Sequence, residues 1–194
     1  MIFFLIGATN RNPRSLFLEY REYQSKNIPK SKGAISKMDD ITSEIKILFG
    51  SETGTAEEYA FDIETALQTN GFKCSVSDMD DYEKSELESE HLVVIVTSTY
   101  GNGEAPYNAE ELHSWLESEE IDLSSIKFAV CALGDSGYPN FAQAGKDFDK
   151  YLEEKGAERI LARTELDAVF DEPVEPFIEK LLDWLSENGQ AYIN

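Results

Sequence analysis

From residue 44 onward, continuous or alternating apolar stretches are separated by segments whose apolar positions recur every three or four residues. The first kind of stretch has the length and composition of β-strands, and the second kind is typical of amphipathic helices. Five strands are predicted in this way, over residues 44–50, 72–78, 91–99, 127–134 and 158–163. Their alternation with helices predicts an α/β fold with a five-stranded, doubly wound parallel sheet.

The predicted helices have recognisable ends. The helix over residues 56–71 carries apolar residues at helical spacing and stops at Gly71. Asn108, with Glu111 three residues later, resembles a capping box that opens the next helix. A third helix presents apolar positions from Phe141 to Leu152, and Pro173 is expected to open the last one.

The distribution of charge divides the chain. Residues 1–38 contain seven basic and two acidic residues, whereas the remainder carries a net charge of −26. We therefore predict a basic N-terminal extension over residues 1–43, either disordered or for targeting, a folded domain over 44–188 and a tail over 189–194. The apolar opening, residues 1–8, is too short to span a membrane, which takes about 20 apolar residues.

Composition narrows the classes of function. A net charge of −21 is unfavourable for binding nucleic acid or an anionic membrane, and favours a basic protein partner. Cys74 and Cys131 lack metal-ligand spacing and fit a reducing, cytoplasmic compartment, although the N-terminal extension leaves organelle targeting open. His91 and His113 have no neighbour at ligand spacing, so no metal site is expected.

Three loops rich in small and polar residues follow predicted strands. They read GSETGTA after the first strand, TSTYGNGEAPYN after the third and LGDSGYPNF after the fourth. In a sheet of strand order 2-1-3-4-5, these loops line one edge, at the carboxyl ends of the strands, where doubly wound sheets bind ligands. The sequence therefore predicts one shared site.

The first loop is suited to a phosphate. Ser51, Thr53 and Thr55 offer hydroxyl groups, and the amides of residues 52–56 stand at a helix N-terminus, whose dipole favours an anion without any cation. A Walker loop would need Gly-Lys-Ser/Thr, and a dinucleotide fingerprint would need G-x-G-x-x-G, neither of which is present. The first and third strands also lack the acidic residues of a phosphorylation receiver.

The other two loops indicate what the phosphate belongs to. Tyr100 and Tyr138 occupy matching places beyond the third and fourth strands, where two aromatic rings can sandwich a flat ring system. Such a ligand with one terminal phosphate is flavin mononucleotide, FMN.

The three loops, in this order, resemble the FMN loops of flavodoxins over about residues 44–187. They are more specifically similar to the FMN domains of diflavin reductases, which implies a flavodoxin-like sheet of order 2-1-3-4-5. The resemblance implies that the first loop holds the phosphate, that Tyr100 and Tyr138 face the ring, and that Asp167 lies near it. Asp135, Asn140 and Ala142 depart from the common pattern.

The complete set of predicted cofactor-binding residues comes from the three loops and from the segment after the fifth predicted strand. It comprises Ser51, Glu52, Thr53, Gly54, Thr55, Ala56, Ser98, Thr99, Tyr100, Gly101, Asn102, Gly103, Leu133, Gly134, Asp135, Tyr138, Asn140, Phe141 and Asp167. No nucleophile or general base for separate substrate chemistry stands out, so the chemistry is expected on the cofactor.

Two functions remain open from the sequence. The first is a one-electron carrier that takes electrons from an NADPH-dependent flavin reductase and passes them to a basic haem or iron–sulfur protein. The alternative is an FMN-dependent quinone or small-molecule reductase, which needs one open ring face. An interaction module that has lost its cofactor is a third interpretation, and the intact hydroxyl loop argues against it.

Overall fold

A computed structural model describes residues 43–193 of the 194-residue chain. The chain divides into two units, Met1–Asp40 and Ile41–Asn194. The predicted basic extension, apart from Ser43, lies outside the described residues, as does the final residue of the predicted tail. Within residues 43–193, none of the helices combines the length and apolar character that a membrane crossing requires.

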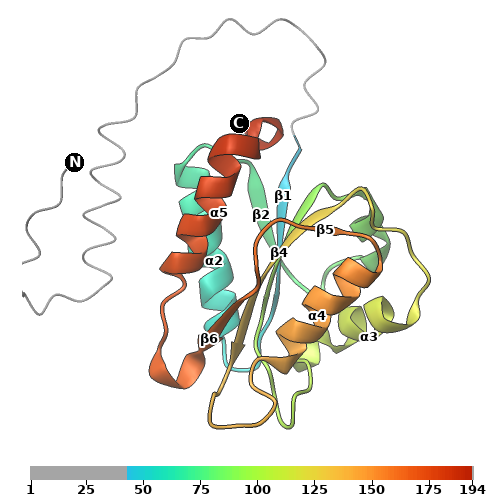
Figure 1. The fold of residues 1–194 in the computed structure, drawn as a ribbon, viewed down its shortest axis with the longest axis vertical. Helices are drawn as coiled ribbons and strands as arrows, with labels where there is room; N and C mark the ends of the chain where they lie inside the picture. Colours follow the sequence, from blue (N-terminus) through green and yellow to red (C-terminus); the bar gives the residue numbers. More distant parts are fainter. Residues whose placement is uncertain (1–42, 194) are drawn as a thin grey trace, which may run out of the picture. The chain divides into compact units, whose positions relative to one another are not determined.

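The centre of the domain is a parallel sheet. Its strands are β1 (Ile45–Gly50), β2 (Cys74–Asp78), β3 (Leu92–Thr97), β4 (Lys127–Gly134), β5 (Glu158–Arg159) and β6 (Thr164–Asp167). The order is β2-β1-β3-β4-β5, with β6 also paired to β4, and every pairing is parallel (Figure 1). The predicted fold class and strand order are confirmed.

The fifth strand differs from the prediction of one continuous strand over residues 158–163. Only Glu158 and Arg159 of that range form a strand, β5, which pairs with the start of β4, while β6 begins after the range and pairs with the end of β4. Arg159 Nε and Arg163 Nη1 donate to the two carboxylate oxygens of Asp149, at 2.7 and 2.6 Å. Both guanidinium groups, one from β5 and one from the segment before β6, therefore meet on a single buried carboxylate.

Helices cover both faces of the sheet. They are α2 (Thr55–Thr69), α3 (Glu110–Ser118), α4 (Gln143–Glu154) and α5 (Glu175–Asn188), with short 3-10 turns η1 (Lys84–Ser89), η2 (Tyr107–Ala109), η3 (Ala168–Phe170) and η4 (Gln190–Tyr192). Figure 1 shows α2 and α5 on one face and α3 and α4 on the other. Two buried clusters, one on each face, form the core.

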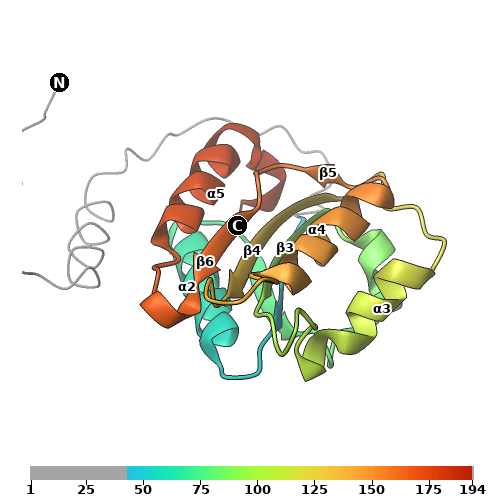
Figure 2. The same cartoon turned by 60° about the horizontal axis from the view of Figure 1, so that its bottom comes forward.

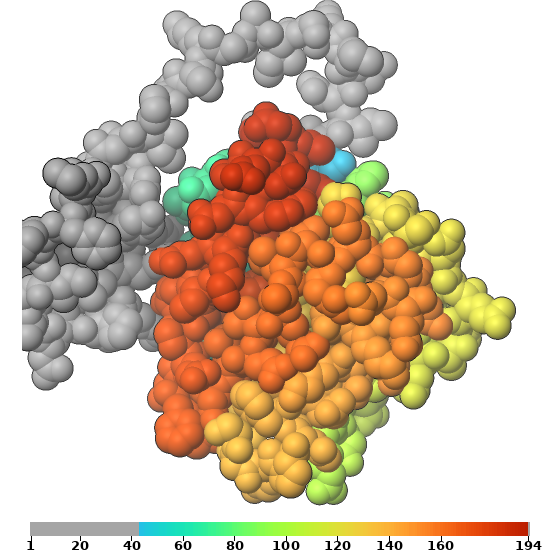
Figure 3. Space-filling model, viewed as in Figure 1, coloured from blue at the N-terminus to red at the C-terminus, as the bar shows by residue number. Residues whose placement is uncertain are grey.

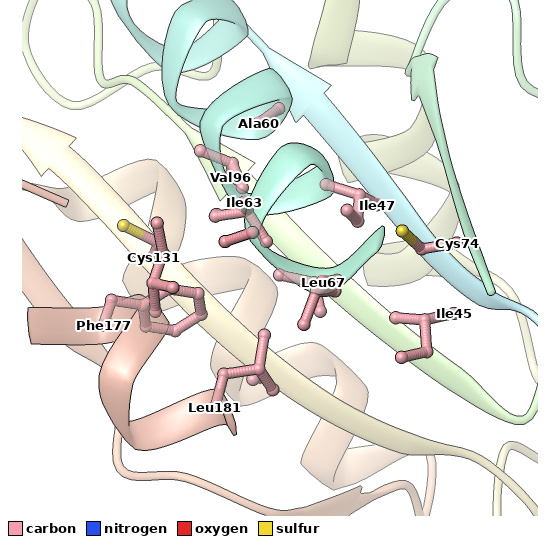
Figure 4. Packing of buried hydrophobic residues seen from close by; sticks show 14 of the residues in the cluster. Ile45, Ile47, Ala60, Ile63, Leu67, Cys74, Val96, Cys131, Phe177 and Leu181 are labelled. Atoms are coloured by element: carbon pink, nitrogen blue, oxygen red, sulfur yellow. The ribbon is translucent and has the colours of Figure 1, made fainter. Parts of the chain in front are cut away.

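The core bears out the predicted helix pattern. Ile63 and Leu67 of α2 are fully buried and pack in one cluster with Val96 of β3 and Phe177 and Leu181 of α5 (Figure 4). Burial of a side chain of this size stabilises the fold by about 1.5–3 kcal/mol.

Two helix ends can be compared with the sequence. Gly71 has a φ of +87° just beyond the end of α2, in the left-handed conformation that its predicted role as a helix stop requires. The last helix does not open at Pro173: it begins at Glu175, with Pro176 in its first turn. Proline fits that place because the first turn of a helix needs no partner for its N–H groups.

The two ends of the described domain meet at the amino-terminal edge of the sheet. The Ser43 N–H donates to the Ala191 carbonyl at 2.9 Å, and Ile193 forms an antiparallel bridge with Phe72. Tyr192, within the segment predicted as a tail, is buried in the core.

Candidate functional site

The three predicted loops gather at the carboxyl edge of the sheet. β1, β3 and β4 are neighbours in it, and the loops that follow them lie together at the edge that Figure 2 turns forward. β6 ends at the same edge, since Asp167 is in register with Gly134, the last residue of β4. The topology therefore brings residues from positions 51 to 167 to one rim.

The first loop turns into α2 through Gly54, whose φ of +93° places it in the left-handed region. Glycine reaches this conformation at little cost, and it stands here at the N-cap. No side chain caps the helix; the Ser51 hydroxyl instead accepts a hydrogen bond from the Gly54 N–H at 2.9 Å. The uncapped amides of the first turn, together with the helix dipole, form a favourable place for an anion.

Asn108 does not have the capping role that the sequence predicted, and its side chain supports the first loop instead. Its side chain caps neither η2 nor α3, so the predicted capping box is wrong. Asn108 Oδ1 accepts a hydrogen bond from the Ser51 N–H at 2.9 Å, while its Nδ2 donates to both carboxylate oxygens of Asp78 at 3.0 Å. The amide thus ties the start of the first loop to the end of β2.

A second support comes from Glu52. Its carboxylate accepts a hydrogen bond from the Tyr107 N–H at 2.8 Å. This contact holds the acidic side chain against η2, on the segment that also carries Asn108. The first loop is therefore fixed at two adjacent residues by a segment more than 50 positions away.

The second and third loops enclose a pocket of about 430 Å³. It is lined by Thr99, Tyr100, Gly101, Asn102, Asp135, Tyr138 and Asn140, all of which belong to the predicted set. The side chains of the two tyrosines are largely solvent-accessible, with Tyr100 60% and Tyr138 63% exposed. The volume falls within the range of about 300–1,000 Å³ that is usual for small-molecule sites.

The second loop closes on itself. The Tyr100 N–H donates to the Glu104 carbonyl at 2.9 Å, and the Gly103 N–H donates to the Tyr100 carbonyl at 3.0 Å. Gly101 and Gly103 have φ values of +54° and +119°, which a tight turn of this kind needs. Thr99 Oγ1 accepts a hydrogen bond from the Ala144 N–H at 3.2 Å, which fastens the loop to the start of α4.

The third loop has its own turn and a link to the second. Asp135 Oδ1 accepts from the Gly137 N–H at 2.8 Å, and the Asp135 carbonyl accepts from the Tyr138 N–H at 3.1 Å. The Asn140 side-chain amide donates to the Asn102 carbonyl. Asn140, one of the departures from the family pattern, therefore connects the two walls of the pocket.

Asp167 supports the third loop from behind. Its side chain is 4% exposed and is not among the pocket-lining groups. One carboxylate oxygen accepts from the Ser136 N–H at 3.1 Å and the other from the Val169 N–H at 3.0 Å. Hydrogen bonds from Ser136, followed by those from Val169 and Phe170, lower the pKa of Asp167, so it is a carboxylate at neutral pH.

The remaining predicted residues of the second and third loops lie beneath the pocket. Ser98 bonds to the Gly50 carbonyl through both its N–H and its hydroxyl, at 2.9 and 3.4 Å, which joins the second loop to the end of β1. Leu133 is buried, and a Cβ on Gly134 would lie 2.5 Å from the Ala142 backbone nitrogen, so only glycine fits there. Phe141 is half-buried beneath Lys146.

Comparison with known proteins agrees with this geometry. The family profile described as flavodoxin matches residues 47–180. The chain belongs to the flavodoxin family. Flavodoxins bind FMN, so the chain is a flavodoxin-like flavoprotein domain, and the predicted cofactor is confirmed.

Individual relatives refine this placement. The chain is 39% identical over 150 residues to the sulfite reductase (NADPH) flavoprotein alpha-component of Bacillus subtilis, covering 77% of this chain and 25% of the relative. It is 40% identical over 142 residues to NADPH oxidoreductase A of Dictyostelium discoideum, covering 72% and 22%. The chain thus spans about a quarter of the length of these curated relatives.

Among solved structures, a flavodoxin from Streptococcus pneumoniae TIGR4 superposes with a TM-score of 0.64 at 28% identity, covering 75% of this chain and 97% of that one. A variant of the flavodoxin from Pseudomonas aeruginosa gives 0.62 at 31% identity, covering 77% and 98%. The flavodoxin-like portion of the chain is therefore matched by nearly whole flavodoxins.

Proposed function

We propose that this protein is a one-electron carrier in which FMN receives electrons from an NADPH-dependent flavin reductase and delivers them to a basic haem or iron–sulfur protein. The proposal depends on one structural observation: an uncapped helix N-terminus and a pocket flanked by two tyrosines lie at the same rim. Each feature suits one end of FMN, and each is formed mainly by residues that the sequence singled out.

At the phosphate end, residues 51–56 would hold the anion through neutral donors. Ser51, Thr53 and Thr55 supply hydroxyl groups, and the first amides of α2 supply N–H groups and the positive end of the helix dipole. The segment GSETGTA contains no lysine or arginine, so binding relies on these donors alone. The Ser51 N–H, already occupied by Asn108, sets the shape of the loop and is not one of the donors.

At the ring end, Tyr100 and Tyr138 would contact the flavin faces. FMN, when bound, supplies the redox chemistry by accepting and releasing electrons. Asp135 lines the same pocket, and its carboxylate disfavours further negative charge there. A ring held beside Asp135, in a chain of net charge −21, is therefore expected to be a strong electron donor.

The acceptor is expected to meet the α3 side of the rim. A second hollow of about 390 Å³ is lined by Asp80, Tyr107, Glu110, Glu111 and Ser114. Lys84 pairs with Glu111, which partly neutralises it, so Glu110 contributes most of the charge that the α3 glutamates offer at this hollow. An acidic surface beside the cofactor rim favours rapid encounter with a basic protein.

The donor is inferred from the relatives. Two of them are named as NADPH-dependent proteins, and the segment resembling this chain is about a quarter of each. We therefore propose that an NADPH-dependent flavin reductase supplies the electrons.

The alternative function, an FMN-dependent quinone or small-molecule reductase, needs one open ring face for its substrate. That Tyr100 and Tyr138 both line one pocket supports the carrier over this alternative.

Cys74 and Cys131 are buried free thiols. Burial raises the pKa of each to about 12, which keeps them as unreactive thiols. These thiols support the proposed cytoplasmic location.

The test begins with the absorption spectrum of the purified full-length protein and mass analysis of the released chromophore. A yellow protein that releases FMN, and that after photoreduction passes electrons to ferric cytochrome c, would support the carrier. A protein that turns over quinones with NADPH, but does not reduce cytochrome c, would instead establish the alternative.

A further inference from the structure

The turn η3, directly after β6, presents two adjacent apolar side chains to solvent. Val169 is 61% and Phe170 75% exposed. In residues 43–193, the other exposed large apolar side chains without a hydroxyl group, Phe61 and Ile193, stand singly. Single exposed apolar residues are common, whereas adjacent ones beside a functional site call for an explanation.

The turn is held in shape by a set of hydrogen bonds. The Asp167 N–H donates to the Glu172 carboxylate at 2.8 Å, and the Glu172 N–H donates to the Asp167 carbonyl at 3.2 Å. Tyr59 of α2 donates its hydroxyl hydrogen to the Glu172 carbonyl at 2.8 Å. Asp171 has a φ of +50°, a left-handed conformation that a non-glycine residue keeps only when its surroundings hold it there. Val169 and Phe170 are therefore held outward by a built turn.

The same turn is attached to the wall of the ring pocket, which is the pocket formed by the second and third loops. Asp167 bonds the Val169 N–H with one carboxylate oxygen and the Ser136 N–H with the other. Ser136 follows Asp135, which lines the pocket. The segment that carries η3 forms the loop between β6 and α5 in Figure 1, and the surface around it is seen in Figure 3.

Acidic groups surround the apolar pair. Residues 171–179 contain four acidic residues and no lysine or arginine, whereas Glu165 is paired with Arg163 and Lys146. Burial, and then the charges of Cys131, Asp171, Glu175 and Glu58, raise the pKa of Tyr59, whose hydroxyl donates to the Glu172 carbonyl of this turn. The complementary surface is an apolar pocket with a basic border.

We propose that Val169 and Phe170 anchor the NADPH-dependent reductase that donates electrons to this domain, on the other side of the ring pocket from the α3 surface. This inference rests on the proposed carrier function. Apolar anchors suit a longer-lived contact, and charges without apolar anchors suit a brief one. The NADPH-dependent relatives contain the equivalent of this domain as about a quarter of a longer protein, so the donor is the partner expected to remain close.

The proposal is tested with full-length protein carrying Val169→Ser and Phe170→Ser together. A purified NADPH–flavodoxin reductase serves as the donor and ferric cytochrome c as the final acceptor. Each NADPH oxidised to NADP⁺ releases one proton and reduces two ferric haems. The KM of the reductase for the double variant should rise about tenfold, with kcat, FMN content and transfer from photoreduced protein to cytochrome c unchanged.

Two further variants isolate the effect. Ile193→Ser removes an exposed apolar side chain at the opposite edge of the sheet and should leave the KM unchanged. Phe170→Leu keeps an apolar anchor and should retain most of the wild-type KM. Unchanged circular dichroism would show that the double variant is folded.

Three outcomes would overturn the inference. A double variant with wild-type KM for the reductase would show that η3 is not an anchor. Slower transfer to cytochrome c, with reduction by the donor unchanged, would assign the patch to the acceptor. A wild-type protein without FMN would remove the proposed function and this inference together, whereas the first two outcomes leave the proposed function intact.

Discussion

The loop predicted to hold the phosphate and the loops predicted to hold the ring are supported in different ways. The first is fixed from outside, by Asn108 at Ser51 and by the Tyr107 backbone at Glu52. The ring loops are held mostly by turns within themselves, and Asn140 links one to the other. Both kinds of support stand on the same sheet edge, and the ring loops are in addition fastened to distant residues, by Thr99 to Ala144 and by Ser136 to Asp167.

We propose that this difference gives the two regions different tasks. A loop fixed before the ligand arrives loses little conformational entropy on binding, so the phosphate end is suited to affinity. Loops that close on themselves can change shape with less disturbance to the core, and the ring end is suited to setting the redox properties of the cofactor. The following predictions test this division, beginning with the largest expected effect.

Thr53→Ala combined with Thr55→Ala should weaken FMN binding about 100-fold. Each hydroxyl removed is worth roughly 1.5 kcal/mol or more towards a charged acceptor. Fluorescence titration with riboflavin, which lacks the phosphate, provides the control: wild type should bind it far more weakly than FMN, and the double variant should bind it as wild type does. Equal affinity of wild type for the two ligands would contradict the phosphate assignment.

Asn108→Ala should weaken FMN binding about tenfold while leaving riboflavin binding unchanged. The substitution leaves the Ser51 N–H without its partner and removes one of the two residues that donate to the Asp78 carboxylate, at a cost of about 1–3 kcal/mol. The matched control is Asn188→Ala, since that amide bonds to the Trp184 carbonyl within α5, away from the three loops. If both asparagine variants bound FMN equally well, outside support of the first loop would not matter.

Tyr138→Ala and Tyr100→Ala should each weaken FMN and riboflavin alike, by about two- to tenfold, because a stacked aromatic is worth about 0.5–1.5 kcal/mol. Flavin fluorescence should increase, since an aromatic in contact quenches it, and the redox potential should shift. The equal effect on both ligands separates these variants from the phosphate-loop variants. Unaltered binding, fluorescence and potential in both would disprove the sandwich.

Glu110→Gln should slow electron transfer to cytochrome c about two- to fivefold at low salt and have little effect at 0.5 M salt, where charges are screened within a few ångströms. Glu111→Gln should have a smaller effect, because Lys84 already pairs with Glu111. Both variants should keep their FMN. A rate that does not respond to salt in wild type would show that this surface does not dock the acceptor.

The sequence predicted the fold well where burial determines it. Leu92–Thr97 and Lys127–Gly134 are covered on both faces, so their apolar runs identified them as central strands, and α2 followed its apolar spacing. The predicted single strand over 158–163 was wrong beyond Arg159, in a segment where Asp149 of α4 holds both Arg159 and Arg163. That contact with a buried carboxylate is not visible in local spacing.

The candidate site shows the same limit. All seven residues that line the pocket between the second and third loops belong to the predicted set, because glycine, hydroxyl and aromatic residues after strands mark such a loop, and their contact with the flavin stays a prediction. Asn108 was assigned to a capping box, since the local pattern Asn-x-x-Glu cannot reveal an N–H donor 57 residues away. Ser136, which donates its backbone N–H to Asp167, offers no side-chain pattern from which that bond could be predicted.

The hydrogen bond between Ser43 and Ala191 has a consequence for how such a domain is built into larger assemblies. A domain whose two ends meet can be inserted into another chain or circularly permuted with little distortion. Both connections would then leave from the amino-terminal edge of the sheet, while the cofactor loops occupy the carboxyl edge. A domain connected at its amino-terminal edge can rotate about its connections. Its carboxyl edge then turns from one partner to another, and the linker does not obstruct the docking surface.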